Sequence, residues 1–145
     1  MSEKNIVLVL KKLIELTKNS GIVWHLEGSA NLLVQGISIK PRDIDITTKK
    51  EHLNHFMKVL EKFNPKEKYL AETKAHLVKC FIEGVEIEIA SYEKPEFNRF
   101  DKIKTAKWKG LSVPIMPLPI ALEFYRQIGR KDKVTLIEKY LSTSG

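Results

Sequence analysis

Two pairs of acidic residues are the side chains in this sequence whose types and spacing could do chemistry. Asp43 and Asp45 stand one residue apart in "RDIDIT", and Glu86 and Glu88 repeat the arrangement in "VEIEIAS". Alternate side chains of a strand share a face, so each pair would point the same way while its apolar neighbours turn to the core. Two carboxylates ~7 Å apart on one strand repel each other unless a cation lies between them.

Magnesium suits this pattern of carboxylates. Mg²⁺ takes oxygen ligands from one or two carboxylates and fills its other positions with water and phosphate. If the strand of Glu86 and Glu88 lies beside that of Asp43 and Asp45, three carboxylates could hold two metal ions for an in-line displacement at phosphorus. The alternative is a solvated strand face, on which alternating charges have no catalytic role.

The pair Gly28-Ser29 follows an apolar run and precedes an expected short helix over residues 30–36. Glycine lets the backbone come close to a phosphate, and the first N–H groups of the following helix are unpaired donors. Ser29 adds a hydroxyl donor. The pair therefore reads either as a phosphate cradle or as a plain turn.

Four basic residues are further candidates for phosphate binding. Arg42 stands next to the first acidic pair, and Arg126, Arg130 and Lys131 lie in the C-terminal segment, where they could clamp a triphosphate. Arg130 and Asp132 could equally form an ion pair at a helix end, and the sequence leaves both readings open.

The elements that must position these residues follow from periodicity and turn signals. We expect a mixed α/β sheet of four or five strands flanked by helices. The predicted elements are a helix over 5–18, a strand over 22–27, a short helix over 30–36, a strand in "IKPRDIDIT", a helix over 49–63 opened by a capping box of Thr48 and Glu51, a hairpin turning at Glu83-Gly84, a strand near 108–116, and one broken or two short C-terminal helices.

Composition bounds the class of protein. At 145 residues the chain predicts one domain spanning 1–145, and 43% hydrophobic with 30% charged residues is a globular balance. The lack of a long apolar run argues against a membrane span and against a signal peptide. Cys80 is the only cysteine, which excludes an internal disulfide and favours a reducing, cytoplasmic setting. A net charge of +7 favours polyanionic ligands such as nucleotides or RNA.

Taken in order, these motifs resemble the signature of a known superfamily. An apolar strand, Gly-Ser, a gap of thirteen residues and then Asp-Ile-Asp-Ile is similar to the front motif of the nucleotidyltransferases related to DNA polymerase beta. Glu88, or else Glu86, looks like the third carboxylate of that superfamily, and Glu88 is preferred. The tail "ALEFYRQIGRKDKVTLI" resembles that of small stand-alone members, so the likeness covers about residues 20–135.

The resemblance implies a nucleotidyltransferase-like fold and Mg²⁺-dependent transfer of a nucleoside monophosphate from an NTP, ATP being favoured, to a hydroxyl. By position, Gly28 and Ser29 would hold the β- and γ-phosphates. Asp43, Asp45 and Glu88 would bind two metal ions, and Glu88 would also act as general base toward the acceptor.

The sequence leaves the acceptor open among a small molecule, a tRNA and a protein. "SANLLVQG" lacks the basic residue that some subfamilies place after the turn. Two alternatives to an active enzyme remain: a nucleotide- or RNA-binding module without turnover, and one component of a toxin–antitoxin type pair. The short chain favours a homo-oligomer or a partner protein, and no membrane association is expected.

Overall fold

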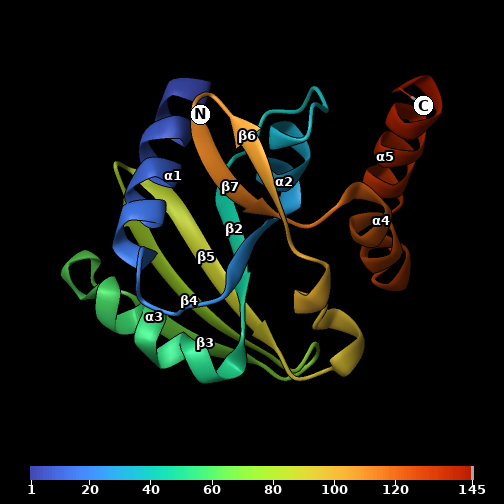
Figure 1. Cartoon of the computed structure of the whole chain (residues 1–145). Helices are drawn as coiled ribbons and strands as arrows, with labels where there is room; N and C mark the ends of the chain where they lie inside the picture. The colour runs from blue at the N-terminus through green and yellow to red at the C-terminus, as the bar shows by residue number, and fades with distance from the viewer. Residues whose placement is uncertain (145) are drawn as a thin grey trace.

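The fold is organised around a mixed sheet of five strands in the order β1-β2-β5-β4-β3 (Figure 1). A computed structural model describes residues 1–144. Strands β2 and β5 run parallel, and the other neighbours are antiparallel. The strands are β1 (Trp24–Glu27), β2 (Ile44–Thr48), β3 (Lys66–Leu70), β4 (Ala75–Ile82) and β5 (Val85–Tyr92). The expected mixed α/β sheet flanked by helices is confirmed.

A separate hairpin of β6 (Lys104–Trp108) and β7 (Leu111–Ile115) packs with β7 against β1 and α1. The strand expected near 108–116 corresponds to β7. The β4–β5 hairpin turns at Glu83 and Gly84, as the sequence predicted.

Five α-helices and four short 3₁₀ turns surround these strands in the described part of the chain. The α-helices are α1 (Glu3–Thr17), α2 (Gly28–Val34), α3 (Leu53–Val59), α4 (Leu118–Gln127) and α5 (Lys131–Ser144). The 3₁₀ turns are η1 (Lys50–His52), η2 (Glu61–Phe63), η3 (Pro95–Phe97) and η4 (Phe100–Lys102). The C-terminal segment thus forms two helices.

The expected capping box at Thr48 is wrong. Thr48 is the last residue of β2, and its hydroxyl donates to the carbonyl of Val23 at 2.7 Å. The helix expected over 49–63 begins instead as η1, which has no side-chain cap, and it continues as the short α3 and η2. The hydroxyl cannot cap the helix because it is already bonded to Val23, the residue that precedes β1.

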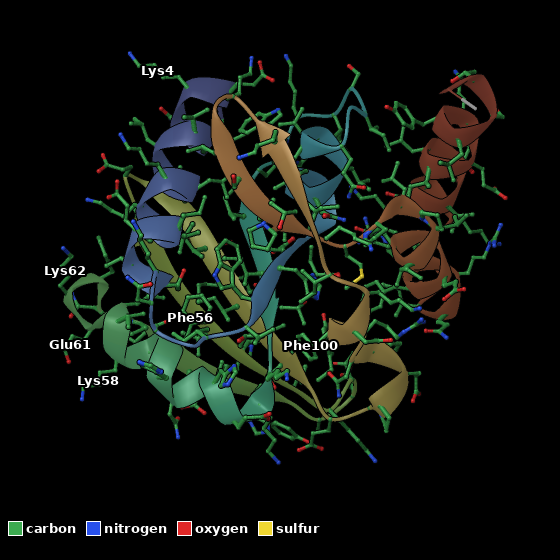
Figure 2. All side chains as sticks on the ribbon, viewed as in Figure 1. Lys4, Phe56, Lys58, Glu61, Lys62 and Phe100 are labelled. Carbon is green, nitrogen blue, oxygen red and sulfur yellow. The ribbon has the colours of Figure 1, made fainter. Side chains whose placement is uncertain are left out.

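Two hydrophobic clusters build the interior, and α2 contributes to both. The first cluster joins one face of the sheet to α1 and α3, and the second joins α2 to α4 and α5. Phe56 of α3 is fully buried in the first cluster, whereas Lys58, Glu61 and Lys62 point outward beside it (Figure 2). Helices α4 and α5 lie together, apart from α1 and α3 (Figure 1). The described helices include none long and apolar enough to cross a bilayer.

Candidate active site

A row of three carboxylates crosses the centre of the sheet. In the antiparallel β1–β2 pair Glu27 lies opposite Asp45, and in the parallel β2–β5 pair Asp45 lies beside Glu88. Asp43 lies in the bend that precedes β2, and its side chain lines the same cleft as Asp45 and Glu88. The sheet thus brings Asp43, Asp45 and Glu88 together, and it adds Glu27, which sequence reasoning missed.

This row borders a cleft of about 620 Å³ between the sheet and the C-terminal helices. Glu88 lines the cleft, whereas Glu86 is outside its lining and lies 3.5 Å from the Lys79 ammonium on β4. Lys79 also comes within 3.9 Å of Glu88. Glu88 therefore faces the cleft and Glu86 does not, while the role of Glu88 as the third acid stays a prediction.

Gly28 touches the acid row directly. Its φ is +62°, a left-handed conformation that side chains disfavour, and a Cβ at this position would lie 2.5 Å from Oδ2 of Asp45. Sequence reasoning placed the need for glycine at a bound phosphate. In the structure the glycine is required by the Asp45 carboxylate, because the start of α2 lies against Asp45 and no Cβ fits between them.

Ser29 is held by a lysine of α5. The Lys133 ammonium donates to the Ser29 hydroxyl at 2.7 Å, and both residues line the cleft. Burial, and then repulsion from Arg130, lowers the pKa of Lys133. Sequence reasoning missed Lys133, although it follows Arg130 by three residues and so lies on the same side of the helix start.

The other predicted basic residues divide between the cleft and its surroundings. Arg42 and Arg130 line the cleft, and the Arg130 guanidinium makes two hydrogen bonds of 3.1 Å to Asp132, so it is both an ion-pair partner and a cleft residue. Arg126 is bonded instead to Glu138 at 2.8 Å on the exposed surface, outside the cleft. Lys131 is exposed and is also outside the lining, because the first turn of α5 directs Lys133 inward in its place.

The acids of the row repel one another in a partly buried setting. Burial, followed by repulsion from Asp43, Glu88 and Glu86, raises the pKa of Asp45 to about 7. Burial, followed by repulsion from Asp45, raises the pKa of Glu27 to about 8. Burial also raises the pKa of Glu88, against the opposing effect of Lys79. A cation at the row would relieve this repulsion.

The donor set fits Mg²⁺ with an open coordination sphere. In residues 1–144, no group of three or more His, Cys, Asp and Glu side chains is already arranged as a metal cage. Mg²⁺ does not need one, because it binds through one or two carboxylates together with water and substrate phosphate. Asp43, Asp45 and Glu88 supply only oxygen, the ligand atom that a hard cation prefers.

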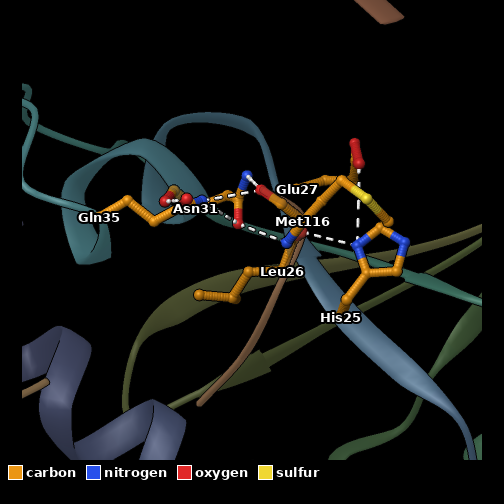
Figure 3. A network of polar contacts seen from close by, with 6 residues as sticks. All are labelled: His25, Leu26, Glu27, Asn31, Gln35 and Met116. Atoms are coloured by element: carbon orange, nitrogen blue, oxygen red, sulfur yellow. Dashed lines mark hydrogen bonds and ion pairs between the residues drawn. The ribbon is translucent and has the colours of Figure 1, made fainter. Parts of the chain in front are cut away.

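A buried amide network fixes α2 and hence the Gly28-Ser29 turn. Asn31 donates to the Met116 carbonyl at 2.9 Å and accepts from the Met116 N–H at 3.0 Å (Figure 3). Gln35 donates to the same carbonyl at 2.8 Å. At the C-terminal end of α2, the Tyr140 hydroxyl of α5 donates to the backbone carbonyl of Gln35 at 3.1 Å. These bonds hold the turn in register with the segment that leads into α4.

Comparison with known families gives one match that covers most of the chain. The sequence profile of the aminoglycoside-2''-adenylyltransferase family matches residues 9–138. A search among curated proteins finds no significant match.

Solved structures share the fold at low sequence identity. A Thermotoga maritima protein described as a nucleotidyltransferase superposes with a TM-score of 0.76 at 21% identity, over 99% of this chain and 96% of its own. The lincosamide antibiotic adenylyltransferase LnuA, bound to lincomycin, gives 0.64 at 15% identity, over 95% and 97% of the two chains. ANT(2'')-Ia in complex with adenylyl-2''-tobramycin gives 0.65 at 12% identity, over 94% and 90%.

Proposed function

The chain belongs to the aminoglycoside-2''-adenylyltransferase family, and we propose that it transfers an adenylyl group from Mg²⁺-bound ATP to a hydroxyl of a small molecule. Nucleotide transfer is the activity of the family. The choice of ATP, of Mg²⁺ and of a small acceptor belongs to the proposal. Support for a small acceptor comes from the family and from LnuA and ANT(2'')-Ia, which hold lincomycin and an adenylylated tobramycin.

One observation carries the proposal: the strand register gathers Asp45 and Glu88 beside the Gly28 turn, in a cleft that also contains Lys133. The acids that would bind a metal and the lysine that would bind phosphate thus line the same cleft. The cleft of about 620 Å³ lies within the usual range for small-ligand sites, roughly 300–1,000 Å³.

In this proposal the triphosphate lies against Ser29, Lys133, Arg130 and Arg42. The Lys133 ammonium, which now donates to Ser29, would share its donors with the terminal phosphates. Arg130 and Arg42 add charge at the side of the cleft. Because Gly28 has no side chain, the backbone of the turn would leave room for the α-phosphate to approach Asp45.

The reaction is a displacement at the α-phosphorus. The acceptor oxygen forms a bond to that phosphorus, the bond to the bridging oxygen of the β-phosphate breaks, and pyrophosphate leaves. The proton of the acceptor hydroxyl passes to a carboxylate oxygen of Glu88, which lies beside Asp45 in the cleft lining.

Asp43, Asp45 and Glu88 are the residues that would hold Mg²⁺. When bound, the metal would neutralise charge on the phosphate oxygens and help the leaving group to depart. Asp45 on β2 and Glu88 on β5 share a face, and Asp43 in the bend before β2 lines the same cleft, so all three side chains would reach the metal from one side.

Calorimetric titration of the four nucleoside triphosphates, with and without Mg²⁺, tests the proposal. We expect Mg²⁺-dependent binding with ATP preferred, and its loss in Asp43→Asn and Asp45→Asn. Both variants should keep the fold, and Asp45→Asn should melt at a higher temperature than the parent without ligand, because a repelled carboxylate is removed. Equal nucleotide binding by the parent and both variants would rule out the metal site.

A further inference from the structure

A second row of side chains lies next to the carboxylates on the same face of the sheet. In the strand register His25 lies opposite Thr47, and Thr47 lies beside Ala90. Each of these residues stands two positions from a member of the carboxylate row. Thr47 and Ala90 line the same cleft as the acids. Since both side chains are small, they form a floor on which a ligand group can rest.

The Thr47 hydroxyl in this floor is buried without a partner. Thr47 is 1% exposed, and within residues 1–144 its Oγ1 is the one buried side-chain polar atom that makes no hydrogen bond. A buried hydroxyl without a partner costs free energy that a valine of the same shape would avoid. Valine also suits a strand well. The neighbouring Thr48 shows the ordinary arrangement, because its hydroxyl donates to Val23.

Glu27 is the second polar group at this place, and within residues 1–144 no hydrogen bond reaches its carboxylate. The nearest ring nitrogen is Nδ1 of His25, 3.8 Å from Oε1, but that nitrogen lies 2.8 Å from the Leu26 carbonyl and gives its hydrogen there (Figure 3). At the opposite end of the row, Lys79 lies within 3.9 Å of Glu88. Among the residues that the structure describes, no lysine lies so close to Glu27, and its carboxylate lines both the main cleft and the recess next to it.

Aromatic rings enclose the space above this floor. Tyr92 follows Ala90 on the same face of β5, and Phe124 and Tyr125 of α4 complete the wall of the cleft. Tyr92 and Phe124 have ring centroids 5.9 Å apart and support each other. The surroundings therefore offer two polar atoms at one side and apolar ring surfaces at the other. Saturated rings that carry hydroxyls or amines have both kinds of surface.

We propose that Glu27 and Thr47 bind a second hydroxyl or amine of the acceptor, carried on the same ring as the hydroxyl that receives the nucleotide. The inference rests on the proposed function. Residues on one strand face repeat every ~7 Å, and each hydrogen bond spans ~3 Å, so substituents of one six-membered ring can reach both rows. Glu27 and Thr47 then determine which acceptors are bound.

The test uses cyclohexane-1,3-diol as the probe and cyclohexanol as its matched control, titrated into the isotope-labelled protein and followed by NMR. The diol should shift the amide signals of Glu27, Thr47 and Tyr92, and it should bind at least fivefold more tightly than cyclohexanol. Thr47→Val should weaken diol binding about fivefold, as expected for one neutral hydrogen bond. Glu27→Gln should weaken it further.

Thr48→Val is the control variant. It loses a hydrogen bond present in the folded protein and should lower the melting temperature, while leaving diol binding unchanged. Thr47→Val should keep or raise the melting temperature. Equal diol binding by the parent and Thr47→Val, or no advantage of the diol over cyclohexanol, would overturn the inference and assign the hydroxyl to bound water. Mg²⁺-ATP binding by the parent, measured separately, reports on the proposed function alone.

Discussion

Replacing Gly28 with alanine adds one methyl group at the point where the turn meets the acid row. Two effects follow from the structure. The residue must keep a φ of +62°, and the new Cβ would lie 2.5 Å from Oδ2 of Asp45 and 3.3 Å from its Cγ. The carboxylate therefore has to move by about 1 Å to reach an ordinary contact of ~3.5 Å.

Two costs add up to the expected loss of stability. A left-handed alanine costs about 1–2 kcal/mol. Turning the Asp45 side chain away from its preferred rotamer costs about 0.5–1.5 kcal/mol more. We expect Gly28→Ala to lower the free energy of unfolding by roughly 1.5–3.5 kcal/mol. For a chain of this size, each kcal/mol lowers the melting temperature by about 4 °C. Mg²⁺-ATP binding should be lost, because the displaced carboxylate is a proposed metal ligand.

Gly84→Ala is the matched control. Gly84 has a φ of +74° in the β4–β5 turn, and a Cβ there would have no atom within 4 Å. It should show the backbone cost alone, with normal Mg²⁺-ATP binding by calorimetry. In an Asp45→Ala background, Gly28→Ala should cost no more than Gly84→Ala, because the colliding oxygen is gone. Normal nucleotide binding by Gly28→Ala, or an undiminished cost in that background, would refute the reasoning.

Three further predictions concern single side chains. Glu88→Gln should abolish adenylyl transfer, measured by pyrophosphate release, while largely sparing nucleotide binding, because Asp43 and Asp45 remain to hold Mg²⁺. Glu86→Gln should reduce transfer less, and the reverse ranking would move the base to Glu86. Lys133→Met should weaken ATP binding, measured by calorimetry, about tenfold or more and AMP binding far less. The reason is that a charge-assisted hydrogen bond to the terminal phosphates is lost. An equal loss for ATP and AMP would contradict this. Burial lowers the pKa of His25 from 6.5 to about 4, so the unfolded chain binds the proton first, and about 3 kcal/mol of stability is lost as pH falls from 6.5 to 4. His25→Phe should flatten that part of the stability profile in urea unfolding, and an unchanged slope would exclude His25 as its source.

The sequence predicted the elements whose apolar residues alternate clearly. The strand with Asp45 and the hairpin that carries Glu88 were expected where the structure has them, although β2 begins at Ile44 and leaves Asp43 in the preceding bend. Strand β3 was missed because its residues, Lys66–Leu70, are mostly exposed and charged and so have no buried face to reveal. Its pairing with β4, and not its own pattern, makes it a strand.

The sequence predicted only those parts of the candidate site that lie within a single strand or turn. Asp43 and Asp45 follow from one local motif, but Glu27 joins them through antiparallel pairing with Asp45, which is eighteen positions away in sequence. Lys133 lies more than a hundred positions from Ser29 in sequence, and the direction of its side chain depends on how α5 packs. No local pattern contains this information.

The bonds between Asn31 and Met116 have a consequence for the order of folding. These residues are 85 positions apart, and closing so long a loop delays a contact relative to the hairpins and helices that form locally. The sheet with α1 and α3 can therefore assemble before α4 and α5 are in place. Since α2 completes its packing only when both helices arrive, we expect the Gly28-Ser29 turn to be among the last parts to become rigid. Its amides should be among the first to exchange with solvent in the native state.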